Sequence, residues 1–455
     1  MDSNYFQKIF LKQEQSISKA KSKTLAELDC DLKSFGAYSL NNHVEYLDDG
    51  VPFIRGINLK KGRITFNDVI YISNEAHKLL WKSEVRPKTI LLSMSGTIGD
   101  VAIASESLKY PINSNQDVAK IYCSEQLNPY YLYTFLRSYF GQNYLIREAR
   151  GSVQQHVFLS QIEKFQIPEF STIFDKAIES LVKNADLSDS HSKQCYEKSE
   201  NLLLETLGMA DFSPSAEKVN IKSFKDSFAA TSRLDAEYYQ LMFEDIEAKI
   251  SSKKHARLDD LVSFINHGKQ PPYVEGGTVR VFSQKWIGDK SIDYSFLDAT
   301  DEPFTSQDFA CQYSDFVAKT NDIVYYSVGA NLGYCHNYLA NEPFMPGSFI
   351  TLIRADGEKI NPIYLGVALN SSLGRMQAEK RKSASAQPYI YPKDISEFLI
   401  PIVDIETQTK IAALVQQSFS LKAESERLLE AAKHAVEISI ETNEDAALAW
   451  LASIH

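Results

Sequence analysis

The stretch QQHVFLSQIEKFQIPEFSTIFDKAIESL, residues 154–181, occurs twice in this chain. Its second copy, QPYIYPKDISEFLIPIVDIETQTKIAAL, covers residues 387–414. A repeat of this length indicates a duplicated structural unit. Matching residues keep an offset of 233 positions, as in the pairs Gln154/Gln387, Ile162/Ile395, Phe165/Phe398, Pro168/Pro401, Ile178/Ile411 and Leu181/Leu414.

Each copy passes from a short apolar run into a helical pattern. The run ends in Ile167-Pro168 or in Ile400-Pro401, and because proline cannot donate to a sheet, it suits a strand at a sheet margin. The apolar residues that follow recur at three- and four-residue spacing, which predicts one long helix per copy with a narrow seam. The seams contain Ile178, Leu181, Ala185, Cys195 and Leu202 in the first copy and Ile411, Leu414, Leu421, Leu428, Ala432 and Ala435 in the second, interrupted by Ser192, Ser199, Ser418 and Ser425.

The small seam residues would let the two helices approach closely and pack along each other. The alternative is that each helix lies separately on its own half of the chain.

The duplication extends over almost the whole chain. Tyr5-Phe6-Gln7, Phe10, Leu25 and Leu28 match Tyr238-Tyr239-Gln240, Phe243, Leu258 and Leu261 at the same offset of 233. Both halves then carry the same signals in the same order. These are a glycine turn (Gly36, Gly268) after a short helix or strand, a half-buried strand pattern (51–62, 278–289), a hairpin around a glycine turn (88–104, 321–335), and a helix opened by Asn128-Pro129 or Asn361-Pro362. The prediction is an α+β fold, two similar globules that each carry a long helix.

Composition bounds the class of protein. The chain has 455 residues, of which 44% are hydrophobic, and a formal net charge of −11. This length suffices for two or three domains with their own cores. Neither a membrane-spanning run nor a signal peptide is evident, so we expect a cytoplasmic protein. The five cysteines and nine histidines have no ligand spacing, which argues against a disulfide framework or a metal site.

Two motifs resemble catalytic ones but have simpler interpretations. Gly96-Thr97-Ile98-Gly99 is expected to be a hairpin turn, because a phosphate loop needs a following helix. The sequences Asn128-Pro129-Tyr130-Tyr131 and Gln270-Pro271-Pro272-Tyr273 resemble the base-holding motif of amino-methyltransferases without completing it. No catalytic set recurs in both halves, so two copies of a binding surface are the better interpretation. We expect no catalytic residue and no cofactor.

The candidate binding residues are basic and amide side chains that recur in matching segments of the halves, which we expect to be loops. Arginine and lysine neutralise phosphates, and Gln, Asn and Arg can contact base edges. The candidates are Arg55, Lys60, Lys61, Arg63, Asn115, Gln116, Arg147, Arg150, Ser152, Gln154 and Gln155 in the first half, and Lys269, Gln270, Arg280, Ser283, Gln284, Lys285, Arg375, Lys380, Arg381, Lys382 and Gln387 in the second. Any one of them alone is better explained as a solvated surface residue.

The acidic total opposes strong DNA binding by the isolated chain. Either the acids are segregated from these loops, or a partner supplies part of the phosphate contacts. Both explanations predict weak binding of DNA by this chain alone.

The sequence resembles the specificity subunit of type I restriction-modification systems over essentially its whole length. The resemblance rests on the tandem repeat, LLSMSGTIGDVAIA (91–104) followed by Asn115-Gln116, Asn128-Pro129, the loop from Gly151 to Gln154, the Ile-Pro junctions, and SRLDAEYY (232–239). The second half departs from it, with Ser348-Phe349 in place of Asn115-Gln116 and Ala384 in place of Gly151.

The resemblance implies two target recognition domains, each reading half of a split site in double-stranded DNA, and two long antiparallel helices in a pseudo-two-fold arrangement. The helices would act as a spacer and as the docking site for two modification (methyltransferase) subunits. Methyl transfer from S-adenosylmethionine to adenine, and cleavage by ATP-dependent restriction subunits, would belong to the partners. The expected segments are 1–168 (domain 1), 169–210 (helical spacer 1), 211–233 (linker), 234–401 (domain 2) and 402–455 (helical spacer 2).

Helices of roughly 30 to 40 residues extend about 45 to 60 Å, which suits half-sites about 10 base pairs apart. One rival interpretation is an adaptor that assembles proteins without reading DNA. Another is a self-contained DNA-modifying enzyme, which would bind S-adenosylmethionine itself.

Overall fold

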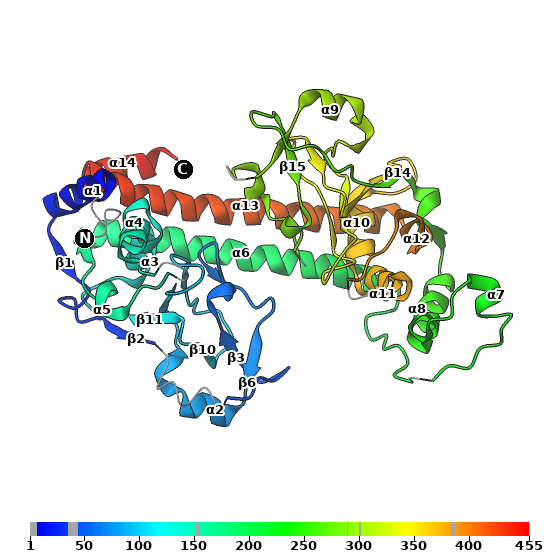
Figure 1. Ribbon diagram of the computed structural model, residues 1–455, viewed down its shortest axis with the longest axis horizontal. Coiled ribbons are helices and arrows are strands. Elements are labelled where there is room, and N and C mark those ends of the chain that lie inside the picture. Colours follow the sequence, from blue (N-terminus) through cyan, green and yellow to red (C-terminus); the bar gives the residue numbers. More distant parts are fainter. Residues whose placement is uncertain are drawn as a thin grey trace. The chain divides into compact units, whose positions relative to one another are not determined.

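A computed structural model describes residues 7–34, 44–151, 155–217, 219–288, 290–299, 302–383 and 387–454. The chain divides into two compact units (Figure 1). Unit 1 comprises Met1–Asp189 and Ala423–His455, and unit 2 comprises Ser190–Lys422. The division falls inside the two long helices α6 (Thr172–Thr206) and α13 (Ile405–Glu441), so each unit contains a segment of both.

Unit 1 mixes short strands with helices. Beside its segments of α6 and α13, its helices are α1 (Lys8–Lys19), α2 (Asn74–Leu79), α3 (Pro129–Arg137), α4 (Tyr139–Glu148), α5 (Leu159–Ile162) and α14 (Glu444–Ser453). Its strands are β1 (Ser22–Thr24), β2 (Asp31–Lys33), β3 (Val51–Ile54), β4 (Leu59–Lys60), β5 (Arg63–Ile64), β6 (Ile70–Ile72), β7 (Glu84–Val85), β8 (Ile90–Ser93), β9 (Val101–Ile103), β10 (Ile112–Ser114), β11 (Val118–Tyr122) and β12 (Gln166–Pro168).

Unit 2 has the same composition. Its own helices are α7 (Phe228–Thr231), α8 (Leu241–Ser251), α9 (Gln307–Gln312), α10 (Pro362–Asn370), α11 (Ser372–Arg381) and α12 (Pro392–Ser396). Its strands are β13 (His255–Arg257), β14 (Val262–His267), β15 (Val279–Phe282), β16 (Phe304–Thr305), β17 (Ile323–Tyr326), β18 (Cys335–Asn337), β19 (Phe344–Pro346), β20 (Ile350–Ala355) and β21 (Leu399–Pro401).

The sheets repeat from one unit to the other. The order β2-β11-β8-β9 in unit 1 corresponds to β14-β20-β17-β18 in unit 2, and β6-β3-β10-β7 corresponds to β16-β15-β19 without a fourth strand. The Ile-Pro strands pair antiparallel with the strand near each half's start, as β1-β12 and β13-β21. The predicted α+β class and the duplication are therefore confirmed.

Equivalent side chains make equivalent contacts in the two units. The hydroxyl of Tyr131 donates to the Pro168 carbonyl at 2.8 Å, and that of Tyr364 donates to the Pro401 carbonyl at 2.6 Å. Asn128 and Asn361 accept bonds from the first N–H groups of α3 and α10, as expected of N-cap residues. Both predicted helix starts are confirmed.

The predicted hairpins are confirmed as β8-β9 and β17-β18. In the first, Ile90 faces Ile103, whereas in the second Ile323 faces Asn337. The second turn is thus one residue longer, in line with the displaced second glycine.

The strand expected over 51–62 and its counterpart over 278–289 are too long. Each ends after four residues, at Ile54 or Phe282, and a 3-10 turn follows, η3 (Gly56–Asn58) or η7 (Gln284–Trp286). At Gly56 a Cβ would lie 2.7 Å from the Ser93 hydroxyl, so the chain passes close to the β8 strand there. The segment expected before Gly268 is a strand, 3-10 turn and strand; Tyr5, Phe6 and Gly36 lie outside the described residues.

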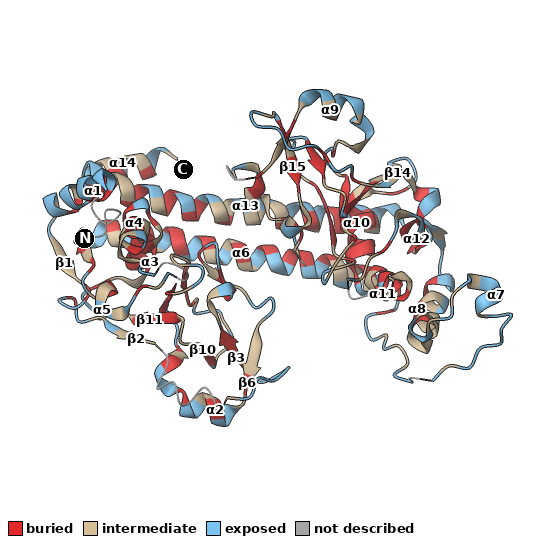
Figure 2. Cartoon of the chain, in the orientation of Figure 1, coloured by how far each residue is buried: buried red, intermediate tan, exposed pale blue. Residues whose placement is uncertain are grey.

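The predicted helical seam is a real contact within each unit. In unit 1, Ile178, Leu181 and Ala185 of α6 share one buried cluster with Leu428, Ala432 and Ala435 of α13. In unit 2, the hydroxyls of Ser192 and Ser418 each donate to the other residue's carbonyl at 2.8 Å. The segments of α6 and α13 run antiparallel, and along each of them buried residues alternate with exposed ones (Figure 2). The alternative hypothesis, that each long helix lies separately on its own half of the chain, is therefore wrong.

The start of α6 brings carboxylates of unit 1 together. Glu444 of α14 accepts hydrogen bonds from the Ser171 backbone N–H at 2.9 Å and from the Ser171 hydroxyl. Asp175 lies in the first turn of α6, where its Oδ1 is buried without a hydrogen-bond partner among the described residues. Burial, with the charges of Glu444 and Glu179, raises the pKa of Asp175 to about 6. A carboxylate is therefore held in an unfavourable place at neutral pH.

Asp175→Asn is expected to raise the free energy of unfolding by about 1 to 2 kcal/mol at pH 7.5. Because the folded chain holds this proton more tightly than the unfolded chain, the stabilising neutral form is fully present below the ordinary value of 3.8 and is lost as the pH rises through about 6. Asparagine stays neutral, so the gain should shrink toward zero near pH 4. Chemical denaturation of both proteins at the two pH values measures this, and a gain independent of pH would contradict it.

Candidate nucleic-acid interface

Four segments of unit 1 that are distant in sequence converge beside the ends of its strands. The Asn115 N–H donates to the Ile54 carbonyl at 2.9 Å, the Met94 N–H to the Asp117 carbonyl at 2.8 Å, and the Val157 N–H to the Met94 carbonyl at 3.0 Å. His156 also forms isolated bridges with Ser95 and Arg150. We call residues 55–58, 94–100, 115–117, 150–151 and 155–157 loop cluster 1.

Unit 2 contains the equivalent cluster. The Gly347 N–H donates to the Phe282 carbonyl at 2.9 Å, the Ser327 N–H to the Phe349 carbonyl at 3.2 Å, and the Gly329 N–H to the Pro388 carbonyl at 2.8 Å. Loop cluster 2 is residues 283–286, 327–333, 347–349 and 387–391. The duplication therefore reproduces the assembled loops as well as the core.

Each cluster is built around the glycine turn of its hairpin. Gly96 and Gly329 have positive φ angles of 76° and 109°, which L side chains rarely adopt. A strand, not a helix, follows each turn. The geometry is that of a hairpin turn, as predicted, and not that of a phosphate loop.

About half of the predicted binding residues lie in or beside the clusters. Lys60 lies close enough to Asp100 to favour its charged form, although burial raises the pKa of Asp100 overall. Gln270 accepts a hydrogen bond from the Ser348 hydroxyl at 3.0 Å, which places it beside cluster 2. The residues brought together are Arg55, Asn115, Gln116, Arg150 and Gln155 in cluster 1, Ser283, Gln284, Lys285 and Gln387 in cluster 2, Lys60 and Lys61 on the β4-β5 hairpin, and Lys269 and Gln270 after β14. Ser152 and Gln154 lie outside the described residues.

Several predicted cations are engaged within their own unit. Arg280 donates to the Ala299 carbonyl at 2.8 Å. Arg63 lies 3.5 Å from the Asp189 carboxylate of α6 and also donates to Ser425 of α13. The others form ion pairs on α4 and α11 or just after α11: Arg147 with Glu14, Arg375 with Glu200, Lys380 and Arg381 with Glu247, and Lys382 with Glu379.

The expectation that these segments are loops is wrong for Arg147, Arg375, Lys380 and Arg381. They belong to α4 or α11, whose last turns form ion pairs with carboxylates of α1 and α8. The expectation is also wrong for Lys60, Arg63 and Arg280, which lie on strands β4, β5 and β15. The exposed fractions of the Arg147 and Lys380 side chains are 6% and 9%. Contacts that stabilise the fold therefore occupy these cations.

Both clusters contain buried polar atoms that have no hydrogen-bond partner among the described residues. Cluster 1 has Nε of Arg55 and Oδ1 of Asn115, and cluster 2 has Oγ of Ser283, Oε1 of Gln284 and Nε1 of Trp286. Leaving such a group unpaired costs about 1 to 3 kcal/mol, so each such atom needs a ligand or ordered water to explain it. Such atoms also occur elsewhere in the described ranges, for example in Gln13 and Tyr325, but here they lie among the predicted amide and basic residues, which makes both clusters candidate binding surfaces.

Sequence reasoning missed the aromatic side of cluster 2. Phe349 and Tyr391 are 54% and 52% exposed, and the Tyr389 and Tyr391 rings meet edge to face at 4.9 Å. Single exposed aromatics also occur elsewhere in the described ranges, for example Trp81 and Tyr273, but these two lie beside the amide and basic residues of cluster 2, where grouped apolar side chains suit a binding surface. The signal was available, because both tyrosines lie in the duplicated stretch at positions where the first copy has His156 and Phe158.

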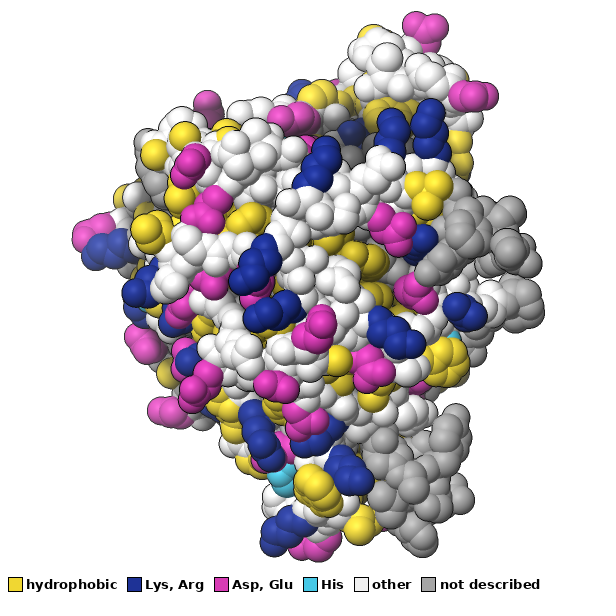
Figure 3. Space-filling view, turned by 90° about the vertical axis from the view of Figure 1, so that its left-hand side faces the viewer, with side chains coloured by type: hydrophobic (Ala, Val, Ile, Leu, Met, Phe, Trp, Pro, Cys, Tyr) yellow, Lys and Arg dark blue, Asp and Glu magenta, His cyan; other side chains and the backbone are white. Residues whose placement is uncertain are grey.

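Charge is mixed on the surface. On the face drawn in Figure 3, basic and acidic side chains intersperse. In cluster 2, Lys285 pairs with Glu302. Carboxylates therefore lie close to cations beside the clusters. Because opposite charges partly cancel, each unit alone attracts phosphate only moderately.

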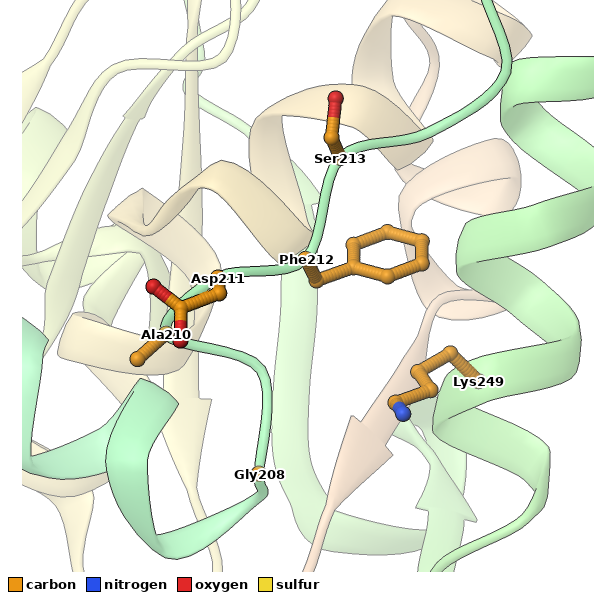
Figure 4. A pocket seen from close by; sticks show the side chains of 6 residues that line it. All are labelled: Gly208, Ala210, Asp211, Phe212, Ser213 and Lys249. Atoms are coloured by element: carbon orange, nitrogen blue, oxygen red, sulfur yellow. The ribbon is translucent and has the colours of Figure 1, made fainter.

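A hollow of about 490 Å³ in unit 2 shares no lining residue with cluster 2; Figure 4 shows its lining. Its lining is Gly208, Ala210, Asp211, Phe212, Ser213 and Lys249. Phe212 extends toward α8, while Asp211 and Lys249 point apart (Figure 4), so it holds no paired acid and base. Over the described ranges, no cluster of three or more His, Cys, Asp or Glu could hold a metal, and no helix is both long and apolar enough to cross a membrane.

Known proteins have similar sequences. The sequence model of a family described as the type I restriction modification DNA specificity domain matches residues 23–169 and 251–432, well over half of the chain. The EcoBI specificity subunit, a type I restriction enzyme subunit of Escherichia coli, is 25% identical over 123 residues. That match spans 27% of this chain and only 26% of the relative, about a quarter of its length.

Two solved structures are similar over most of the chain. The S subunit of a type I restriction-modification system from M. genitalium has a TM-score of 0.42 and 15% identity, covering 92% of this chain and 95% of its own. The HsdS subunit from Thermoanaerobacter tengcongensis has a TM-score of 0.31 and 14% identity, with coverage of 93% and 97%.

Proposed function

This chain belongs to the type I restriction modification DNA specificity domain family, and from that membership we propose that it is the sequence-specificity subunit of a type I restriction-modification complex. Each unit reads one half of a bipartite site in double-stranded DNA. The observation that carries this proposal is the presence of two equivalent loop clusters, one per tandem unit, each with unpaired buried polar atoms.

The clusters have the chemistry needed to read DNA. Asn115, Gln116 and Gln284 offer paired donors and acceptors that suit base edges, and Lys60, Lys61, Arg150 and Lys269 offer charges that suit phosphates. The aromatic rings of Phe349 and Tyr391 suit apolar contacts such as a thymine methyl group. We assign DNA contact to the cluster residues and not to the ion-paired residues of α4 and α11.

The chemistry of the complex belongs to partners. Two modification subunits, docked on the helical spacers 169–210 and 402–455, would carry out methyl transfer, and ATP-dependent restriction subunits would cut. The chain itself would be non-catalytic and would need no cofactor. The net charge of −11 fits this division, because partners would supply further phosphate contacts. The recognition domains would be 1–168 and 234–401, joined by the linker 211–233.

Co-expression of this chain with its adenine methyltransferase partner is expected to methylate a split motif with a fixed non-specific gap. Mapping methylated adenines in host DNA, with and without this chain, measures it. Methylation that appears only with this chain would support the proposal and identify both half-sites. A stable complex without new methylation would favour the protein-assembly adaptor, and binding of S-adenosylmethionine by the isolated chain would favour a self-contained enzyme.

A further inference from the structure

A lysine is buried in the core of unit 1, beneath loop cluster 1. Lys120 lies on β11 with 0% of its surface exposed. Its Nζ donates to the Ser114 hydroxyl at 3.0 Å and to the Val118 carbonyl at 3.0 Å. Burial lowers the pKa of Lys120 to about 7. Burying an amine costs free energy unless hydrogen bonds compensate for its lost hydration.

The two acceptors of Lys120 stand at the two ends of one loop. Ser114 is the last residue of β10 and Val118 is the first of β11. The two strands belong to different four-stranded sheets, so the chain crosses between sheets through Asn115, Gln116 and Asp117 alone. Lys120 therefore holds both ends of this loop by hydrogen bonds.

A buried polar network continues below the first end of the loop. The Ser114 N–H donates to Oδ1 of Asn113 at 2.8 Å, and the same oxygen accepts from the Ser83 hydroxyl at 2.7 Å. Nδ2 of Asn113 lies 3.1 Å from Nδ1 of His77 on α2. Ser83, Asn113 and Ser114 are all 0% exposed. The loop end is thus anchored by several fixed bonds.

The second repeat shows that packing alone does not require a lysine here. Lys120 pairs with Leu91 of β8. The residue 233 positions after Leu91 is Val324 of β17, and its partner on β20 is Leu352, which is also 0% exposed. Because the equivalent core position in unit 2 is occupied by leucine, the amine in unit 1 serves the polar contact with Ser114 and Val118.

We propose that Lys120 is a positioning residue for the DNA-reading loop Asn115–Asp117 of unit 1. This rests on the proposed function. The loop carries the amides of Asn115 and Gln116, and its backbone also holds Ile54 and Met94 in cluster 1. Without these hydrogen bonds, both ends of the loop could move. The two amides would then be positioned less accurately against base edges, and base-specific contacts depend on that positioning.

The test uses this chain with the substitution Lys120→Leu, assembled with its modification subunits, and measures DNA binding by the complex. Three duplexes are compared: the native site, the site with its first half replaced, and the site with its second half replaced. The variant is expected to lose discrimination at one half-site by about tenfold and to keep discrimination at the other within about twofold. Phe349→Ala, a change in cluster 2, should reduce discrimination at the opposite half-site.

Folding is checked in the same preparations. Leucine removes the cost of a buried amine, so the unfolding midpoint of the variant should not fall. Ser114→Ala removes one acceptor only and should give a smaller loss at the same half-site. Unchanged discrimination in folded variants, or an equal loss at both half-sites, would overturn the positioning role. A wild-type complex that does not distinguish the three duplexes would overturn the proposed function and this inference with it.

Discussion

Insertion of four helix-forming residues into both α6 and α13, after Ser190 and after Lys422, is expected to lengthen the non-specific gap in the DNA site by about one to two base pairs and to leave both half-sites unchanged. Both positions lie where the chain passes from one unit to the other. Four helical residues add about 6 Å, and a base pair of duplex rises about 3.4 Å. Mapping methylated adenines for the variant and its parent measures the gap directly.

Both helices must be lengthened because they are held in register within each unit. In unit 1, Ser425 donates to the Ala185 carbonyl, and in unit 2 Ser192 and Ser418 exchange bonds. Lengthening α6 alone would place one of these contacts four residues out of register, and methylation should be lost. The same four residues inserted at the exposed turn 223–227 are the matched control and should leave the gap unchanged. An altered half-site with an unchanged gap would contradict the spacer role.

The duplicated fold was predictable because its signals are local. Asn128 and Asn361 cap helices with their own side chains, and the glycine turns at Gly96 and Gly329 need positive φ, so sequence alone shows both. The packing of the two helical seams could be inferred because small residues recur at the helical spacing of both copies, whereas their antiparallel direction was implied only by the family resemblance. The strand predicted over 51–62 was too long. The close approach of Gly56 to Ser93 joins segments that are distant in sequence, so the local pattern does not show it.

The clusters themselves were not predictable as assembled surfaces. Arg55, Ser95, Asn115 and His156 meet because β10 pairs parallel with β3 while β11 joins the other sheet, and such pairing has no local signature. Of the predicted cations, Arg147 and Lys380 looked like loop residues because their partners lie 133 positions earlier in the chain. The repeat held a clue, since Glu14 and Glu247 keep the offset of 233 that relates Arg147 to Lys380.

Glu247→Gln is expected to lower the free energy of unfolding of unit 2 by about 2 to 3 kcal/mol. Glu247 of α8 lies 2.6 Å from the Lys380 ammonium and 3.0 Å from the Arg381 guanidinium, and these cationic side chains are only 9% and 12% exposed. Glutamine can still accept one hydrogen bond but cannot neutralise two poorly solvated cations. Chemical denaturation, with hydrogen exchange of the α8 amides reporting on unit 2, measures the loss.

The double variant Glu247→Gln, Lys380→Met separates an unpaired charge from lost packing. Methionine fills the space of the lysine stem without a charge, so it should recover about half or more of the loss. Glu14→Gln in unit 1 is the matched control, since Glu14 is 50% exposed beside Arg147 and a better-solvated pair is worth less, about 1 kcal/mol. Equal losses for Glu14→Gln and Glu247→Gln, or no recovery in the double variant, would show that the buried cations of α11 do not depend on Glu247. The α4 and α11 cations would then be available for phosphate after all, and the assignment of DNA contact to the loop clusters alone would have to be widened.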